Sequence, residues 1–504
     1  MTERILNQPL FLLLMGIASF SMFLPALHAG LLGSHFEARS FFYAGVLGLL
    51  LVTMVALAMS SRTRRRGEMG NLLALFAGFS LLPLQLALPF HEALRTTSYL
   101  NAYVEMVSSL TTTGATLFDP ERLSPTLHLW RALVGWMGGL LMWVSAAASL
   151  APLNLGGFEV TATAAPGQSD QMHGRFERAD PQRRIVRVPA QLFPVYAGLT
   201  LALWIMLAIS GDHALVALCH AMSVMATSGI SPVGGAQNGG SAITGEAVMA
   251  LFMLFALSRL TFSTATLNTH RPSIRPAPGF RLGLMIVIAV PLLLFLRHWL
   301  ATYSTDDEQN LVLALRALWG GVFTTLSFLT TTGFESAHWE TARDWSGLDT
   351  PGLIFLGLAM IGGGVATTAG GVKLLRVWAL YLNGLREMER LVHPSSVGRS
   401  VGHSRRVRKQ GAYIAWIFFM LFALSLTALA MVFAGFGSSF ENAIVLAVSA
   451  LSTTGPLISI APETEIVLAD LAPVAKLVFC GGMILGRLEM LAIIALLSSD
   501  VWRR

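Results

Sequence analysis

The sequence predicts an all-α polytopic membrane protein of four pseudo-symmetric helix–pore loop–helix repeats, preceded by an extra N-terminal helical pair. Three observations predict this fold. Hydrophobic residues make up 54% of the 504 positions and charged residues only 12%, against roughly 25% charged in soluble domains. Several apolar runs reach the ~20 residues that a bilayer-spanning helix needs. A short Thr-Gly turn also recurs four times, each time inside an apolar region.

Ten apolar segments are long enough to be predicted as membrane spans. They cover residues 8–28, 41–60, 70–90, 127–152, 190–210, 245–267, 280–300, 351–382, 411–435 and 471–499. The first resembles a secretory signal, but its apolar run is longer than a usual signal core, so we expect it to be a span. Cys219 and Cys480 both lie in apolar segments, and we expect no disulfide or metal framework.

Four more mixed segments lie between spans, near residues 98–113, 213–228, 312–332 and 440–454. We expect them to be too short or too polar to cross lipid, and each ends in one of the Thr-Gly turns. They could be extracellular or surface helices. The repeated order of span, short helix, turn and span favours four re-entrant pore loops instead, which membranes tolerate where protein or a water-filled cavity surrounds them.

The four turns share one pattern of small hydroxyl residues and glycine, with Thr two places before the Gly and Ser six places before it. A ring of carbonyls can replace the hydration shell of a cation. Gly permits the positive φ that turns a carbonyl toward an axis, and the preceding helix directs its partly negative end to the same place. One such turn is a common helix cap, but four in register predict an ion-selective constriction. The residues predicted to form this filter are Thr112, Thr113, Gly114, Thr227, Ser228, Gly229, Thr331, Thr332, Gly333, Thr453, Thr454 and Gly455.

The repeat pattern divides the chain into five predicted parts. These are an extra N-terminal transmembrane pair (1–66), pore repeat 1 (67–155), a cytoplasmic connection with pore repeat 2 (156–268), pore repeat 3 with an intramembrane gate loop (269–384), and a cytoplasmic connection with pore repeat 4 (385–504).

A block of glycine interrupts the predicted span 351–382. Each Gly costs a helix about 1 kcal/mol relative to Ala, and broken membrane helices mark backbone that lines a cavity. Close helix packing through small residues is the alternative, but it uses spaced glycines rather than a block. We therefore expect a mobile gate loop beneath the constriction. Its residues are Gly362, Gly363, Gly364, Thr367, Thr368, Gly370, Gly371 and Lys373.

Charged side chains inside spans are costly and often functional. Arg487 is either a pore charge that limits cation occupancy or a structural partner of Glu489 or of pore-helix carbonyls, and both readings stay open. For Lys373 the functional reading is favoured. Glu105, in the first pore helix, is expected to be a structural hydrogen-bond acceptor rather than an ion ligand.

With these motifs the sequence resembles the membrane subunit of the Trk-type potassium uptake systems, in the Trk/Ktr/HKT superfamily. The resemblance rests on the Thr-Gly turns, the glycine block, the Gly486-Arg487-Leu488-Glu489 run and the closing Trp502-Arg503-Arg504. It implies four pseudo-symmetric units around K+ held by filter carbonyls, with Rb+ and more weakly Na+ as other ions. It also implies a homodimer and a separate cytosolic nucleotide-binding regulatory subunit. The second turn departs from the others by carrying Ala226.

Basic residues cluster in connections that fall on one side if the ten spans alternate, which predicts that side to be cytoplasmic. We therefore expect a multi-pass protein of the bacterial inner membrane, in contact with lipid, with cytoplasmic termini and a constriction that opens outward. A nucleic-acid surface is the less favoured reading of the sequence pI near 9.7. The clusters are Arg62–Arg66, Arg175–Arg187, Arg271–Arg281, Arg386–Lys409 and Arg503–Arg504.

The sequence thus favours potassium uptake and no enzymatic activity, with K+ as cargo and no organic cofactor. An Na+/K+ or H+-coupled cation symporter of the same fold stays open. A polytopic membrane enzyme is disfavoured, because the chain has no HExxH motif and an enzyme has no reason to repeat one turn four times. His213 and His220 flank the second pore helix, but two lone histidines there are more often interfacial than metal ligands.

Overall fold

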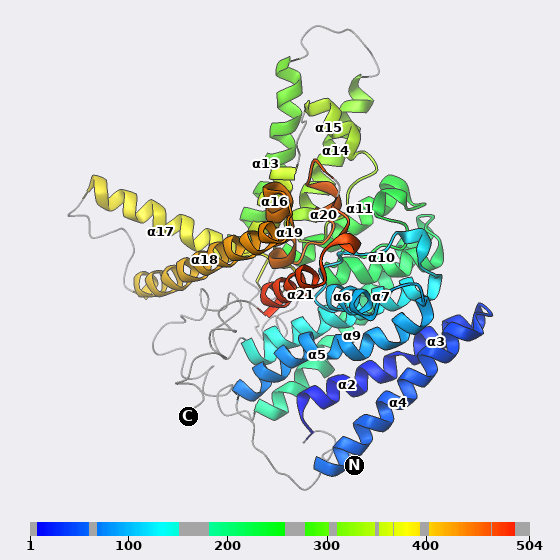
Figure 1. The fold of residues 1–504 in the computed structure, drawn as a ribbon. Helices are drawn as coiled ribbons and strands as arrows, with labels where there is room; N and C mark the ends of the chain where they lie inside the picture. Colours follow the sequence, from blue (N-terminus) through cyan, green and yellow to red (C-terminus); the bar gives the residue numbers. More distant parts are fainter. Residues whose placement is uncertain are drawn as a thin grey trace.

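The computed structural model describes residues 8–59, 68–150, 181–257, 278–301, 310–347, 352–365, 367–393, 403–464 and 466–488. Within these ranges the secondary structure is helical, with no strand (Figure 1). Cys219 and Cys480 are both buried and free. The all-α membrane fold is confirmed.

The N-terminal part begins with α2 (Leu10–Ser21) and α3 (Phe23–Leu31), which run on from one another, and α4 (His35–Met59) returns along both. The predicted first span is therefore two helices that adjoin at Met22. Pro25 is a sufficient reason for the break, since it has no N–H to donate to the carbonyl of Ser21. Large apolar side chains of α4, among them Leu47 and Met54, stay exposed, as expected for a surface that lipid covers.

Four groups of helices follow, in the predicted order of long helix, short helix, turn and second helix (Figure 1). The first has α5 (Glu68–Leu94), α6 (Tyr99–Leu110), η1 (Pro120–Arg122), α7 (Pro125–Ser145) and the π-turn η2 (Ala146–Leu150). The second has α9 (Pro181–Ile209), α10 (Ala214–Ala226), η4 (Ala236–Asn238), α11 (Ala242–Met253) and η5 (Leu254–Leu257). The third has α13 (Pro278–Ala301), α14 (Asn310–Leu329), α15 (Trp339–Ser346), α16 (Gly352–Ile361) and α17 (Leu374–Val392). The fourth has α18 (His403–Gly435), α19 (Phe440–Ser452), α20 (Leu457–Ile460), η7 (Leu468–Asp470) and α21 (Pro473–Leu488).

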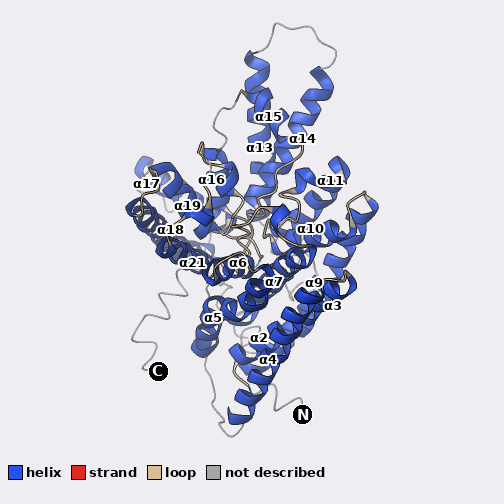
Figure 2. Cartoon of the chain, turned by 45° about the vertical axis from the view of Figure 1, so that its right-hand side comes forward, coloured by secondary structure: helices blue, strands red, loops and turns tan. Residues whose placement is uncertain are grey.

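The helices α6, α10, α14 and α19 all lead into the middle of the molecule, and we call them the turn helices. Figure 2 shows the loops that follow them gathered in the centre, with helices around them. Contacts run from group to group: α10 packs on α7, α14 on α11, α19 on α16 and α21 on α6. This closed set of contacts brings together four turns that are more than 100 residues apart in the chain.

Eight helices of the described chain are long and apolar enough to cross a membrane. Seven coincide with predicted spans. The eighth is Val312–Leu329 of α14, so the expectation that all four short segments are too short or too polar is wrong for the third. Arg316 is the one charged residue in that stretch, and a single Arg leaves the helix apolar on average.

Of three further predicted spans, two are described only in part and one is broken. Helical structure of the predicted span 245–267 covers Ala242–Leu257, and residues 258–267 lie outside the described residues. The span 351–382 is broken at the glycine block into α16 and α17, as predicted. The last span is described only as far as Leu488.

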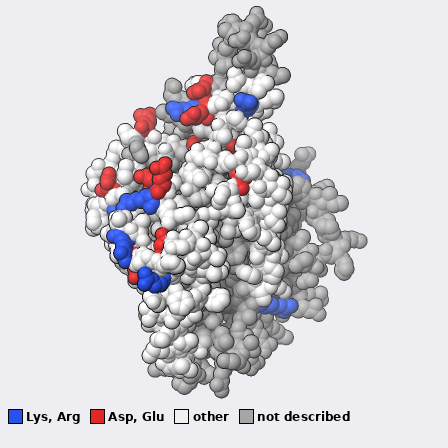
Figure 3. Space-filling model, turned by 90° about the vertical axis from the view of Figure 1, so that its right-hand side faces the viewer, with Lys and Arg blue, Asp and Glu red and all other residues white. Residues whose placement is uncertain are grey.

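The described surface is largely uncharged. On the face turned to the viewer in Figure 3, charged side chains gather along one edge and toward the upper part, and wide areas of the described surface carry none. Such areas fit a protein whose solvent is mostly lipid.

Candidate constriction and gate

Each turn helix ends in the same hydrogen-bonded turn. The carbonyl of the Ser six places before the Gly accepts the amide of the residue one place before the Gly. The N···O distances are 2.9 Å for Thr113 to Ser108, 2.9 Å for Ser228 to Ser223, 2.9 Å for Thr332 to Ser327 and 3.0 Å for Thr454 to Ser449. The repeated Ser of the sequence therefore marks the residue that closes the turn.

The Thr two places before the Gly is left-handed in every copy. The φ angles are 55° at Thr112, 51° at Thr227, 58° at Thr331 and 52° at Thr453. This conformation costs a residue with a Cβ roughly 1–2 kcal/mol, and β-branched Thr is among the least suited to it. Four equal outliers in one place indicate a backbone shape that the surrounding structure imposes, and such strain clusters at functional sites.

The predicted positive φ is found at three of the four glycines, with 74° at Gly114, 66° at Gly229 and 83° at Gly333. For Gly455 the expectation is wrong. Pro456 follows it, and the ring of a proline pushes the preceding residue toward extended backbone.

The four glycines form a closed ring, in which each one touches the next turn. A Cβ built on Gly114 would lie 1.8 Å from the carbonyl oxygen of Ser228, and one on Gly229 would lie 2.3 Å from that of Thr332. A Cβ on Gly333 would meet the ring of Pro456 at 2.9 Å. A Cβ on Gly455 would meet the amide nitrogen of Ala115 at 2.0 Å, which returns to the first turn. The four turns therefore follow one another around a common centre in chain order, and at no contact is there room for a side chain.

The residues of the turns are buried. All twelve predicted filter residues belong to this ring, and their Thr and Ser side chains are at most 1% exposed. The turn helices end here, so the partly negative carbonyl ends of four helices point to one region.

The glycine block forms a loop of residues 362–373, which we call the glycine loop. Its two ends are tied together, since the amides of Val372 and Lys373 donate to the carbonyls of Met360 and Ile361 at 2.9 Å each. Gly362 and Gly371 meet at this neck, where both have positive φ and a Cβ on either would clash with the other strand of the loop. Gly363 and Gly364 lie against Ala256, whose carbonyl accepts the amide of Gly364 at 2.9 Å.

The tip of the glycine loop touches the left-handed threonines. The hydroxyls of Thr227 and Thr368 are 3.1 Å apart, and the amide of Gly370 donates to the hydroxyl of Thr331 at 2.8 Å. A Cβ on Gly370 would lie 2.4 Å from the hydroxyl of Thr453. The loop therefore meets three of the four turns on the side where the turn helices end.

Two buried cations hold the glycine loop from different directions. Arg487 reaches it from α21 and donates through Nη1 to the carbonyl of Thr368 at 2.5 Å. Its partner is thus a loop carbonyl, whereas Glu489 lies outside the described residues. Lys373 donates through Nζ to the carbonyl of Ala369 in its own loop. This bond within the loop could not be predicted from the sequence.

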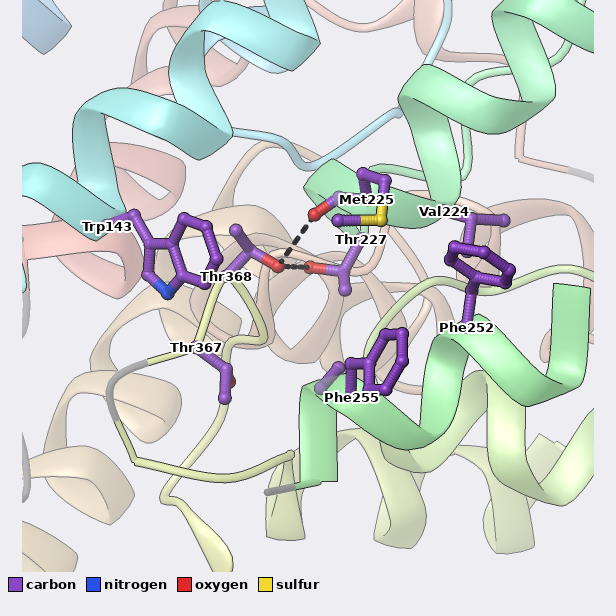
Figure 4. Close-up of a pocket in the computed structure, with 9 residues that line it drawn as sticks. Trp143, Val224, Met225, Thr227, Phe252, Phe255, Thr367 and Thr368 are labelled. Carbon is purple, nitrogen blue, oxygen red and sulfur yellow. Dashed lines mark hydrogen bonds between the residues drawn. The ribbon is translucent and has the colours of Figure 1, made fainter. Parts of the chain in front are cut away.

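A pocket borders the loop on one side. Thr367 and Thr368 line it together with Thr227, and aromatic side chains of α7, α11 and η5 form much of the rest (Figure 4). Figure 4 shows the hydroxyls of Thr227 and Thr368 directed at each other, with the Thr368 hydroxyl also pointing to the carbonyl of Met225, 3.4 Å away.

Known proteins are similar to this chain in sequence and in fold. Residues 280–502 match the family model described as TrkH, a cation transport protein. The Trk system potassium uptake protein TrkH of Salmonella typhimurium is 28% identical over 411 residues, 80% of this chain and 79% of that protein. The corresponding TrkI of Halomonas elongata is 29% identical over 85% of this chain and 82% of its own length. The crystal structure of the potassium transporter TrkH from Vibrio parahaemolyticus matches over 100% of both chains, with a TM-score of 0.80 and 25% identity. The chain is TrkH-like.

Buried carboxylates hold the segments that follow the turns of this TrkH-like chain. Glu105 accepts the amide of Leu117 at 3.0 Å and lies 2.6 Å from Nε of Arg131, which confirms its expected role as a structural acceptor. Glu246 comes from α11 of the second group and accepts from Trp319, Ser336 and Ala337 of the third, at 2.6–2.8 Å. Sequence reasoning missed Glu246, although an acid in an apolar helix was a visible signal.

A further carboxyl of the TrkH-like chain lies just beyond the third turn. Burial raises the pKa of Glu335 to about 7, the Glu340 carboxylate adds to the rise, and Arg343 opposes it. Glu335 is therefore the carboxyl near the ring that changes charge at neutral pH.

Proposed function

We propose that this chain takes up potassium ions across the bacterial inner membrane through the ring of four Thr-Gly turns, which acts as the selectivity filter. The closed glycine ring is the observation that carries the proposal. At three of its four contacts backbone meets backbone, and at the fourth Gly333 meets the ring of Pro456, so backbone carbonyls are the groups available to replace the water around a cation. K+ is the proposed cargo because the relatives are named as potassium uptake proteins.

The left-handed threonines support this role for the turns. A strained backbone is kept in all four copies, as expected where carbonyl direction matters. The converging ends of four turn helices favour a cation in the same place. The twelve filter residues named from the sequence are proposed as the K+ site on these grounds.

We further propose that the glycine loop is the gate, formed by Gly362, Gly363, Gly364, Thr367, Thr368, Gly370, Gly371 and Lys373. Its tip contacts three turns, so it lies across the route away from the ring. Arg487 is the proposed pore charge: its Nε and Nη2 are buried without a hydrogen-bond partner among the described residues, and a cation passing the loop would meet this positive charge.

The proposed orientation places both termini and the basic connections in the cytoplasm, with the filter open to the outside. Many of the basic residues lie outside the described residues, so this orientation rests on the positive-inside pattern. The homodimer and the cytosolic nucleotide-binding regulatory subunit rest on the family resemblance, and the five predicted parts of the chain rest on the repeat pattern.

Growth and flux together test the proposed function. A bacterium that lacks its own potassium uptake should grow on limiting K+ when it expresses this chain with its cognate regulatory subunit, and its membranes should take up Rb+ faster than Na+. An empty vector and the regulatory subunit alone are the controls. Growth without faster Rb+ uptake, or equal Rb+ and Na+ uptake, would contradict a K+-selective filter.

Glu335 should give uptake a dependence on external pH. Because its pKa is raised to about 7, the carboxyl is neutral at pH 6 and negative at pH 8. A negative charge about 10 Å from a cation in water stabilises it by about 0.4 kcal/mol, so the KM for Rb+ should be about twofold lower at pH 8. Glu335→Gln should abolish this difference, and Glu463→Gln, at an exposed position of the fourth group, should keep it. The same pH profile in Glu335→Gln as in the parent chain would refute the assignment.

A further inference from the structure

One position of each turn helix faces the segment that follows the turn. It is the residue nine places before the Gly, and we call it the strut position. Its four occupants are Glu105, His220, Thr324 and Leu446. All four are fully buried, with 0% of each side chain exposed.

Three of the four occupants bind the segment after their own turn. Glu105 accepts the amide of Leu117, three places after Gly114, at 3.0 Å. Thr324 accepts the amide of Ser336, three places after Gly333, at 3.3 Å. His220 bonds through Nε2 to the hydroxyl of Ser231, two places after Gly229, at 2.9 Å. Leu446 carries no polar group, so the fourth turn has no such bond.

The spacing follows from helix and strand geometry. The helix ends three or four places before the Gly, so the strut position lies five or six residues back along it, roughly 8 Å at 1.5 Å per residue. An extended chain covers about the same height in two or three residues. The chain runs toward the turn as a helix and leaves it in an extended conformation. The strut position is the helix residue that lies beside the residue two or three places after the Gly.

Other side chains contact the residues at the strut positions. Arg131 of α7 lies 2.6 Å from Glu105, and Oδ2 of Asp212 lies 3.8 Å from Nδ1 of His220. The ring of His220 also stacks edge-on against Phe334, the residue after Gly333, with ring centroids 5.4 Å apart. His220 thus touches both the second and the third turn. In the third group, Glu246 also accepts hydrogen bonds from the segment after the turn, from the hydroxyl of Ser336 and the amide of Ala337.

We propose that Glu105, His220 and Thr324 are positioning residues that determine cation discrimination. This rests on the proposed function of the ring as a filter. Each of these residues fixes where the backbone that follows its turn lies along the turn helix. It thereby fixes the direction of the carbonyls around the ring. The fourth turn has apolar packing at Leu446 in place of this bond, so the four turns contribute unequally to cation discrimination.

Paired substitutions separate the hydrogen bond from the volume of the side chain. His220→Met and Thr324→Val keep the size and remove the bond, whereas His220→Gln and Thr324→Ser keep a group that can make it. The measurement is the ratio of Rb+ to Na+ uptake by cells that express the full chain with its regulatory subunit, alongside the amount of chain in the membrane. The ratio should fall by roughly 2- to 10-fold in His220→Met, the range that one lost hydrogen bond supplies. The fall should be smaller in Thr324→Val, because Glu246 still holds that segment, and the conservative partners should restore the ratio.

Leu446→Met is the matched control at the same position of the fourth turn helix, and it should leave the ratio unchanged. A general loss of structure would lower uptake of both ions and the amount in the membrane without this pattern. If one substitution prevents folding, the other pair decides. Unchanged ratios in both bond-removing variants, with selective uptake by the parent chain, overturn the strut role alone. Absence of selective Rb+ uptake by the parent overturns the filter proposal and the strut role together.

Discussion

Replacing Gly114 by Ser should reduce Rb+ uptake by roughly 10- to 100-fold, the size of effect that a misplacement of about 1 Å has at a positioned site. The residual uptake should discriminate less between Rb+ and Na+. The new Cβ would lie 1.8 Å from the carbonyl oxygen of Ser228, and Gly114 has a φ of 74°, which Ser adopts only with strain. Since backbone cannot move aside as a flexible side chain can, the second turn must shift, and its carbonyl with it.

Gly198→Ser is the matched control for this substitution. Gly198 lies in α9, and a Cβ there would meet nothing within 4 Å. Rates of Rb+ and Na+ uptake, normalised to the amount of chain in the membrane, are the measurement. If Gly114→Ser kept the parent ratio of Rb+ to Na+ uptake, Gly114 would not belong to the filter.

Replacing Arg487 by Gln should raise Rb+ uptake in the absence of the regulatory subunit by at least about 10-fold. Two effects act in the same direction. The Gln side chain is shorter, so the bond to the carbonyl of Thr368 is weakened, and the positive charge is lost. A unit charge about 8 Å from a cation costs about 2 kcal/mol at an effective dielectric constant near 20. The variant should fold, because removing a buried charge that has no acidic partner among the described residues relieves a desolvation cost.

Thr368→Val tests the other contact of the gate. It removes the bond that the Thr368 hydroxyl accepts from Thr227 and the bond that it donates to the carbonyl of Met225. Uptake should rise in the same assay, by less than in Arg487→Gln. Thr427→Val is the matched control, since the Thr427 hydroxyl donates to the carbonyl of Ala423 within α18, outside the proposed gate. Arg390→Gln is the control for charge, because Arg390 is exposed and pairs with Glu387. A folded Arg487→Gln chain with unchanged or lower uptake would rule out the pore charge.

Much of this architecture could be predicted because it repeats along the chain. The Ser and Thr-Gly spacing returned four times, so it marked the four turns even though each copy alone resembles a common helix cap. The glycine block also stood out, because no helix accommodates five glycines in ten positions without a penalty. The break between α16 and α17 and the buried position of the turns follow from composition.

Other features depend on contacts between distant segments, and the sequence has no local sign of them. Thr is a poor choice for left-handed backbone, so nothing in its chemistry announced φ angles near 55° at Thr112 and its three counterparts. The role of His220 emerges only when the chain returns past the turn helix to Ser231. The hydrogen bond between Glu246 of α11 and the amide of Ala337 joins residues that are 91 positions apart in the chain. For Gly455, the neighbouring proline was visible, and its effect on φ could have been foreseen.

The hydrogen-bonded neck of the glycine loop has a consequence for how fast the loop can open. Its ends are joined by two backbone hydrogen bonds from Val372 and Lys373, so the tip can swing without unwinding α16 or α17. Loop motions of this kind take nanoseconds to microseconds, whereas collective movements of whole helices take microseconds to milliseconds. Brief openings should therefore be intrinsic to the tip, and a bound regulator would act by changing how often they occur rather than by driving each one.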